Sequence, residues 1–288
     1  MDPRQDVLTT VDELAGALGG ERPPAVLDVR WSLAEPDGRP AYRAGHVPGA
    51  VFVDLAAELA APPAAAAGRH PLPDPADLQE AARGWGLQEG APVVVYDDVG
   101  GTSAARAWWL LRWAGLSHVR VLDGGLAGWR RAGRDLAAGE ERPARGDVVL
   151  PLAAGTAGPG LPTTDIDGAA GWPGRGVLLD ARAAVRYRGE QEPVDPRAGH
   201  IPGALSAPTT DLLDDAATFR STDELRRRFA ALGAGGSAPV GVYCGSGVTA
   251  AHEVLALASI GVRATLYPGS WSQWSADPDR EAETGAAP

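Results

Sequence analysis

The segment GHVPGA at residues 45–50 occurs a second time, as GHIPGA at residues 199–204. Three further blocks repeat in the same order along the chain: VLDVR (26–30) and LLDAR (178–182), VVYD (94–97) and GVYC (241–244), GW (128–129) and QW (273–274). Chance matches would not preserve one order, so the chain contains two copies of one domain.

Short apolar runs alternate with segments that carry helix signals in both copies. The runs are 26–29, 92–96 and 119–122, then 177–179, 240–243 and 264–267. Runs of this length separated by helices are typical of buried parallel strands with crossover helices. Thr10 with Glu13 and Ser221 with Glu224 have the spacing of capping boxes at helix starts. The sequence therefore predicts two α/β domains.

The boundaries follow from the repeat and from composition. We expect the first domain over residues 1–138 and the second over residues 163–288. Residues 139–162 are dense in Gly, Pro and Ala and have little periodicity, so they are interpreted as a linker.

Composition excludes several classes of function. The 288 residues contain 26 basic and 37 acidic side chains, with a net charge of −11 and no lysine, which argues against nucleic acid and anionic membranes as partners. A single cysteine can form neither an internal disulfide nor a multi-thiolate zinc site, and no metal or organic cofactor is expected. The first residues lack the apolar core of a signal peptide, and no apolar run reaches about 20 residues, so we expect a cytoplasmic protein.

The two copies differ in the loop after the same strand. It begins with Asp97 in the first copy and with Cys244 in the second, where it reads CGSGVT over residues 244–249. Open α/β sheets bind ligands at the carboxyl ends of their strands, and a helix predicted over 249–259 would point its amide N–H groups at the sulfur, which favours the thiolate. Gly245 and Gly247 allow the loop amides to turn inward around an anion. The alternative is that Cys244 is a small buried apolar residue.

Taken together, the tandem repeat, the paired GHxPGA segments and the CGSGVTA loop resemble the two-domain rhodanese-type sulfurtransferases. This resemblance implies tandem domains, each with a five-stranded parallel sheet flanked by helices, of which the first is catalytically silent. It implies that Cys244 takes a sulfane sulfur as a persulfide and passes it to a thiol or cyanide, with thioredoxin-like proteins among the candidate acceptors. Gly245, Gly247, Val248 and Thr249 would bind the donor through the loop.

The loop also indicates which donor is used. CGSGVTA is uncharged and similar to the loop of 3-mercaptopyruvate sulfurtransferases, whereas thiosulfate-selective members commonly carry cations there. By the same resemblance, Arg186 falls on the position that binds the donor's carboxylate. A second such arginine has no match by alignment, and Arg197 is a candidate to replace it in space. Thiosulfate remains the alternative donor.

When the carbon–sulfur bond of 3-mercaptopyruvate breaks, the enolate that remains must be protonated. The resemblance offers Ser246 with His46 and Asp37 from the first domain as a relay. Against this, His46 and His200 occupy the same place in the two GHxPG segments, so a turn-stabilising role explains both equally well. His70, in a Pro-rich loop, and His252, on the helix after Cys244, are expected to be surface or packing residues.

Two other functions stay open. A sulfur carrier would receive its persulfide from a partner desulfurase and have little activity on free donors. A rhodanese-like phosphatase would need a C-x5-R loop, but the sixth residue after Cys244 is Ala250.

Overall fold

In the computed structural model, two compact units are present, and the structure describes residues 2–152 and 158–286. The first unit comprises Met1–Ala61, Pro73–Leu161 and Asp214–Phe219. The second comprises Pro62–Leu72, Pro162–Leu213 and Arg220–Pro288. Each unit therefore includes one short segment that is surrounded in sequence by residues of the other unit.

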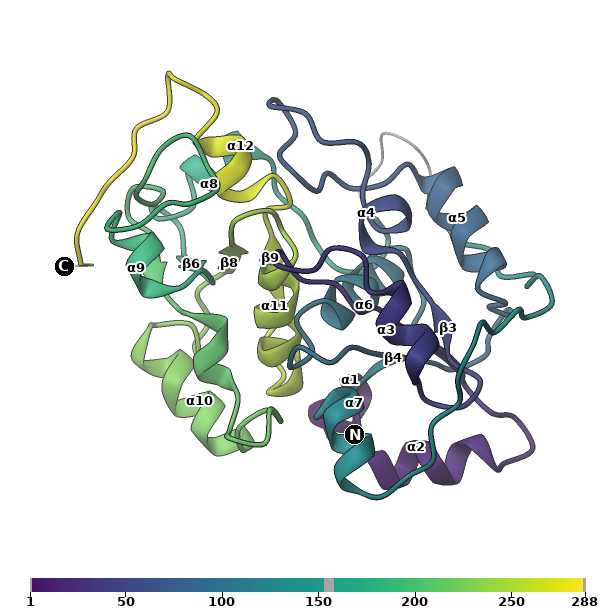
Figure 1. Cartoon of the computed structure of the whole chain (residues 1–288). Helices are drawn as coiled ribbons and strands as arrows, with labels where there is room; N and C mark the ends of the chain where they lie inside the picture. Colours follow the sequence, from purple (N-terminus) through teal and green to yellow (C-terminus); the bar gives the residue numbers. More distant parts are fainter. Residues whose placement is uncertain (1, 153–157, 287–288) are drawn as a thin grey trace. The chain divides into compact units, whose positions relative to one another are not determined.

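The first unit is built on a five-stranded parallel sheet in the order β1-β5-β4-β2-β3 (Figure 1). Its strands are β1 Leu8–Thr9, β2 Ala25–Asp28, β3 Val51–Phe52, β4 Val93–Tyr96 and β5 Val119–Leu122. Its helices are α1 Pro3–Val7, α2 Val11–Leu18, α3 Arg39–Ala44, α4 Leu55–Glu58, α5 Pro75–Gly84, α6 Ala104–Trp113 and α7 Gly125–Arg131. This confirms the predicted five-stranded sheet for the first copy.

The second unit has a parallel sheet in the order β7-β6-β8-β9. Its strands are β6 Val177–Asp180, β7 Leu205–Ser206, β8 Val240–Tyr243 and β9 Ala264–Leu266. Its helices are α8 Ile166–Ala170, α9 Ala184–Tyr187, the 3-10 helix η1 Thr209–Leu212, α10 Thr222–Ala231, α11 Thr249–Ser259 and α12 Ser270–Trp274.

The predicted fifth strand of the second sheet is reduced to an isolated parallel bridge between Thr163 and Leu266, where the first unit has β1. Two backbone hydrogen bonds remain there, from Thr164 N to Leu266 O (2.9 Å) and from Leu266 N to Pro162 O (3.1 Å). Pro162 has no N–H and cannot extend the ladder as a donor, which accounts for the shortened edge.

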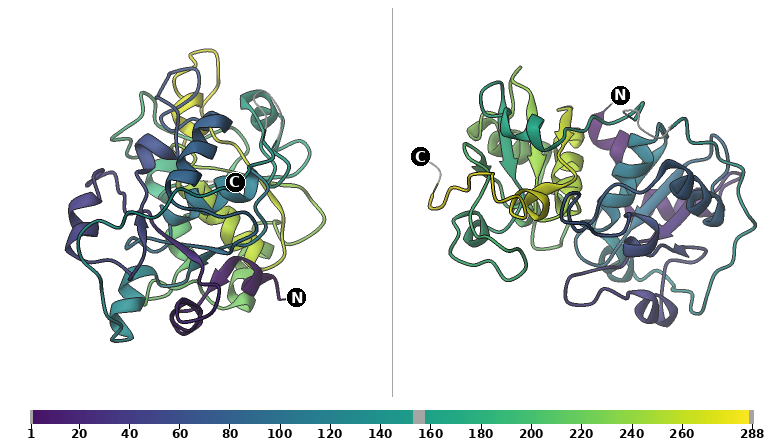
Figure 2. Two further views of the ribbon diagram at one scale, coloured as in Figure 1. Left: turned by 90° about the vertical axis from the view of Figure 1, so that its right-hand side faces the viewer. Right: turned by 90° about the horizontal axis from the view of Figure 1, so that it is seen from above.

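Side-chain alternation along the strands supplies a core on each face of each sheet. In the first unit, Val94 and Tyr96 of β4 pack with α2 and α7, while α6 contacts β4 and β5. In the second, Leu178 of β6 and Tyr243 of β8 share a cluster with α8 and α12, while α11 packs on β8 and β9. Figure 2 shows helices on both sides of the strands in each unit. This layering is what an open parallel sheet requires.

The sequence signals for helix starts are confirmed. Thr10 with Glu13 and Ser221 with Glu224 form complete capping boxes at the starts of α2 and α10. In the described residues, no helix is long and apolar enough to cross a membrane.

The segment expected to be a linker belongs to the first unit up to Leu161, so the observed boundary lies later than predicted. Gly146 N donates to Arg83 O, and Val148 N donates to Leu87 O. Val148 and Leu150 are buried. The described part of this segment is therefore fixed by backbone hydrogen bonds, even though its composition is that of a linker.

Candidate active site

Cys244 lies directly after β8, at the carboxyl end of the second sheet, and begins the loop that leads into α11. We call residues 244–249 the cysteine loop. The Sγ atom accepts hydrogen bonds from Gly247 N (3.1 Å) and Ser246 N (3.4 Å). Amide donors aimed at sulfur stabilise negative charge on it, so the loop suits a thiolate nucleophile.

The shape of the cysteine loop depends on its second glycine. Gly247 has a φ of +78°, and a Cβ atom there would lie 2.6 Å from the carbonyl oxygen of Pro268. A larger residue would have to push the loop away from that carbonyl, which would move the amide that contacts Sγ. Val248 and Thr249 follow as the N-cap and first residue of α11.

The first unit has the same loop with a carboxylate in place of the sulfur. Asp97 is fully buried after β4 and accepts hydrogen bonds from four backbone amides, those of residues 99, 101, 103 and 104, at 2.8–2.9 Å. Burial raises the pKa of Asp97, and the amide hydrogen bonds oppose that shift. The Asp97 carboxylate fills the anion site of the first loop with a group that belongs to the chain.

Arg186 at the end of α9 lies beside the cysteine loop. A Cβ atom on Gly245 would lie 3.5 Å from Arg186 Nη1, so the guanidinium borders this glycine. Its other nitrogens are held by Glu192 (Nη2 to Oε1, 2.6 Å) and Asp195 (Nη2 to Oδ2, 2.9 Å). The two carboxylates fix the guanidinium plane and leave Nη1 on the side of the loop.

A second guanidinium at the loop comes from the segment Pro62–Leu72, which belongs to the second unit. Arg69 Nη2 would lie 2.9 Å from a Cβ atom on Gly245, and Arg69 Nη1 is paired with Asp195 Oδ1. Arg69 could not be predicted from the sequence as a residue of this site, because it lies far from Cys244 along the chain.

The segment Pro62–Leu72 also supplies a histidine. His70 Nδ1 lies 2.8 Å from Ser246 Oγ, within hydrogen-bond distance. The expectation that His70 is a surface or packing residue is therefore wrong, because it forms a side-chain pair with a residue of the cysteine loop. The sequence did contain one signal, which is the pair of basic residues in Gly-Arg-His-Pro at 68–71. Two basic side chains in a loop are seldom required for packing, and loops often carry functional residues.

His46 and Asp37 make contacts inside the first unit. His46 is fully buried, stacks on Tyr42 with ring centroids 4.1 Å apart, and places Nδ1 2.9 Å from Tyr42 O. Asp37 accepts from the backbone N–H of Arg39 at 3.0 Å. His200 repeats the histidine's contacts in the second unit, stacking on Tyr187 at 3.7 Å with Nδ1 2.8 Å from Tyr187 O. The two GHxPG histidines thus have the same structural contacts, and His70 contacts Ser246.

Two further residues considered from the sequence have structural partners. Arg197, considered as a spatial substitute for the unmatched arginine, donates to the backbone carbonyls of residues 274, 275, 277 and 280 at 2.6–2.9 Å. His252 is fully buried, with Nδ1 2.6 Å from Thr209 Oγ1, which fits the packing role expected for it.

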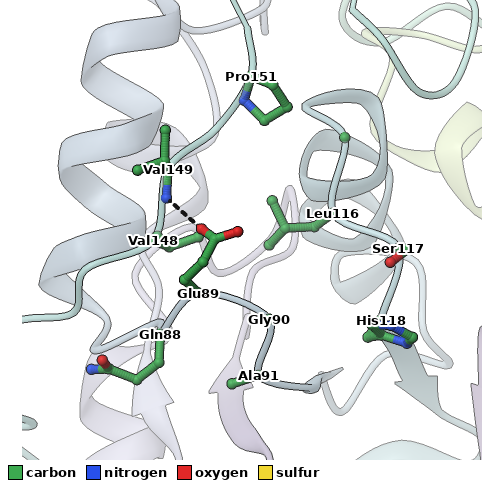
Figure 3. Close-up of a pocket in the computed structure, with 11 residues that line it drawn as sticks. Gln88, Glu89, Gly90, Ala91, Leu116, Ser117, His118, Val148, Val149 and Pro151 are labelled. Atoms are coloured by element: carbon green, nitrogen blue, oxygen red, sulfur yellow. Dashed lines mark hydrogen bonds between the residues drawn. The ribbon is translucent and has the colours of Figure 1, made fainter.

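A pocket of about 350 Å³ lies in the first unit (Figure 3). It is formed by the segments that precede β4 and β5 and by residues 148–151, and Glu89 in it accepts a hydrogen bond from Val149 N at 3.0 Å. It opens at the amino ends of those strands, whereas Asp97 follows the carboxyl end of β4. Throughout the described ranges, no group of three or more His, Cys, Asp or Glu side chains is placed to hold a metal ion.

Comparison with known proteins identifies the family. The model of the rhodanese-like domain matches residues 10–132 and again residues 168–277, and the chain belongs to this family. Over the full lengths of both chains it is 49% identical to a Mycobacterium tuberculosis protein named provisionally as the thiosulfate sulfurtransferase SseB. It is 38% identical to the 3-mercaptopyruvate sulfurtransferase of Escherichia coli, over 84% of each chain. The crystal structure of the E. coli enzyme SseA superposes with a TM-score of 0.78 at 33% identity, covering 92% of this chain and 98% of the other.

Proposed function

We propose that the protein is a sulfurtransferase that moves sulfane sulfur from 3-mercaptopyruvate to a thiol or cyanide through a persulfide on Cys244. The observation that carries the proposal is the pair of amide N–H groups, of Ser246 and Gly247, that converge on Sγ at the carboxyl end of β8. The rhodanese-like family match over both copies supports the same reaction class.

The reaction proceeds as two displacements. The Cys244 thiolate attacks the sulfur of 3-mercaptopyruvate, a sulfur–sulfur bond forms, the carbon–sulfur bond breaks, and its electron pair remains on the substrate as the enolate of pyruvate. A proton on the enolate carbon completes pyruvate. An acceptor thiolate or cyanide then attacks the outer sulfur of the persulfide, which releases the Cys244 thiolate and a new persulfide or thiocyanate.

The enolate is protonated from the Ser246 hydroxyl, coupled to His70. The 2.8 Å contact between His70 Nδ1 and Ser246 Oγ gives the hydroxyl a partner that can restore its proton. We assign to His70 the role that the sequence had suggested for His46 and Asp37, because His70 is the histidine in contact with Ser246.

Arg186, Gly245, Gly247, Val248 and Thr249 form the donor site in this proposal. The chain is similar both to a protein named as a thiosulfate sulfurtransferase and to one named as a 3-mercaptopyruvate sulfurtransferase, so these names do not distinguish between the two donors. Guanidinium nitrogens beside Gly245 favour a carboxylate-bearing donor, since carboxylates match the fork of an arginine. A reducing compartment such as the cytoplasm suits the chemistry, because acceptor thiols remain reduced there.

The persulfide is tested with Cys244→Ala. We expect the wild-type protein to gain 32 Da on Cys244 with 3-mercaptopyruvate, about the mass of one sulfur atom. The variant should show neither the mass shift nor pyruvate release, while it unfolds at a temperature close to that of the wild type. Sulfur transfer by the alanine variant would refute the mechanism, and wild-type turnover on neither 3-mercaptopyruvate nor thiosulfate would favour the carrier function.

The role of His70 is tested by comparing donors. Thiosulfate leaves sulfite and forms no carbanion, so only 3-mercaptopyruvate needs a proton delivered to carbon. His70→Ala should lower kcat with 3-mercaptopyruvate by about 100-fold and leave kcat with thiosulfate within about threefold. His118→Ala, in the pocket of Figure 3, is the control and should change neither value. An equal loss with both donors would assign His70 to loop structure instead.

A further inference from the structure

The segment Pro62–Leu72, which supplies His70, contains a tight turn within the second unit. Ala64 N donates to Gly68 O at 3.1 Å, and Gly68 N donates to Ala64 O at 2.7 Å. Gly68 closes the turn with a φ of +90°, a conformation that favours glycine. His70 follows two residues later, so its position depends on what the turn is packed against.

The turn packs closely against the start of α12. A Cβ atom on Gly68 would lie 2.6 Å from Gly269 O and 2.9 Å from Ser272 Oγ, so a larger residue would push the turn away. Ser272 Oγ accepts a hydrogen bond from Arg69 N at 3.1 Å and donates its own to Gly269 O at 3.1 Å. The hydroxyl of Ser272 thus fastens the turn to the helix.

The backbone of Ser272 holds the cysteine loop at the same time. Ser272 N donates to Gly245 O at 2.9 Å. Gly245 directly precedes Ser246, whose hydroxyl oxygen lies 2.8 Å from His70 Nδ1, and Arg69 directly precedes His70. One residue of α12 is therefore bonded to the backbone neighbour of each member of the His70–Ser246 pair.

We infer that Ser272 is the positioning residue that holds His70 against the Ser246 hydroxyl while the enolate is protonated. This inference rests on the proposed function, which gives His70 and Ser246 their roles. Ser272 is 6% exposed, so its contacts belong to the interior of the unit. A proton is transferred efficiently only within hydrogen-bond reach, so a turn that moves away from α12 would slow this step.

The inference is tested by the turnover of the full chain with 3-mercaptopyruvate and with thiosulfate. Ser272→Ala should lower kcat with 3-mercaptopyruvate by about 3- to 10-fold, the range expected for one lost hydrogen bond. It should leave kcat with thiosulfate within about twofold, because that donor needs no proton on carbon. An equal loss with both donors, or no loss with either, would overturn the inference.

A double-mutant comparison tests whether Ser272 acts through His70, and it needs only 3-mercaptopyruvate. In a His70→Ala background, adding Ser272→Ala should lower kcat by no more than about twofold, since the histidine that Ser272 positions is already absent. Losses that multiply would show that Ser272 acts independently of His70, and the inference would fall.

Ser275→Ala is the matched control. Ser275 is the C-cap of α12 and is 3% exposed, and its hydroxyl has no hydrogen-bond partner within the described ranges. The variant should change kcat with neither donor. A loss that equals that of Ser272→Ala would mean that any change to α12 disturbs the site, which contradicts a specific role of Ser272.

Failure of the proposed function would look different. If His70 does not serve the protonation step, His70→Ala will itself lack a loss selective for 3-mercaptopyruvate, and both proposals will fall. A selective loss in His70→Ala without one in Ser272→Ala would remove only the role of Ser272.

Discussion

At the scale of single residues, the second unit contains a buried acid that the proposed reaction does not use. Glu253 on α11 is fully buried, and neither carboxylate oxygen has a hydrogen-bond partner in the part of the chain that the structure describes. Burial raises the pKa of Glu253 well above its usual value; Arg228 opposes this, and Asp180, Cys244 and Asp211 add to it. Burial therefore favours the protonated form of the Glu253 carboxyl in the folded protein.

This protonation predicts a specific pH dependence of stability. Between the unfolded-state and folded-state pKa values, the folded state holds more protons, so the free energy of unfolding falls as pH rises. Glu253→Gln removes this dependence. The stability of the variant relative to the wild type should therefore increase from pH 4.5 towards pH 8 by up to about 1.4 kcal/mol per pH unit, measured by urea unfolding.

Glu21→Gln provides the comparison, because Glu21 is exposed. It should leave the difference from the wild type flat over the same pH range. A flat difference for Glu253→Gln as well would mean that Glu253 is ionised in the folded protein.

At the scale of elements, the two copies share one strand–loop–helix arrangement but place different side chains in its loop. The carbonyl of Cys244 accepts from Trp271 N at 2.9 Å, and the carbonyl of Asp97 accepts from Leu126 N at the same distance. The backbone is therefore anchored alike in both copies. The residue at the start of the loop decides whether the amides hold a sulfur or a fixed carboxylate.

The aspartate consequently has a structural role that can be measured. Asp97→Ala leaves four inward-facing amides without their acceptor, and unsatisfied buried donors cost about 1–3 kcal/mol each before water enters. We expect the free energy of unfolding to fall by about 2–4 kcal/mol. The neighbouring Asp98→Ala is the control and should cost less than about 1 kcal/mol, because Asp98 is exposed. A similar loss for both variants would contradict this role of Asp97.

At the scale of the whole molecule, the chain forms two related units, and each unit includes one short segment from the sequence of the other copy. Pro62–Leu72 is counted with the second unit although it lies within the sequence of the first copy, and Asp214–Phe219 shows the reverse. Phe219 N donates to Asp123 Oδ1 at 2.9 Å, while Arg69 N donates to Ser272 Oγ at 3.1 Å. These hydrogen bonds explain why each segment belongs with the unit to which it is assigned.

Much of the fold could be predicted because its signals are local. The predicted strand at 240–243 and the predicted helix at 249–259 are observed as β8 and α11 with the same bounds. Trp108 and Trp109, which have helical spacing, are fully buried in α6. Apolar periodicity and capping residues act over a few positions, so they can be read from neighbouring letters.

The repeat and the lone cysteine were also decided by the sequence alone. The repeat places the single thiol in one of two equivalent loops and a carboxylate in the other. The identity of these two residues does not depend on how the rest of the chain folds. The partners of that thiol's loop were decided only by the tertiary structure. Arg69 and His70 reach Gly245 and Ser246 because the segment Pro62–Leu72 packs with α12, through hydrogen bonds such as Gln273 Nε2 to Ala66 O at 2.7 Å. Contacts between residues so far apart along the chain depend on how whole elements pack, and local sequence patterns carry no record of that packing.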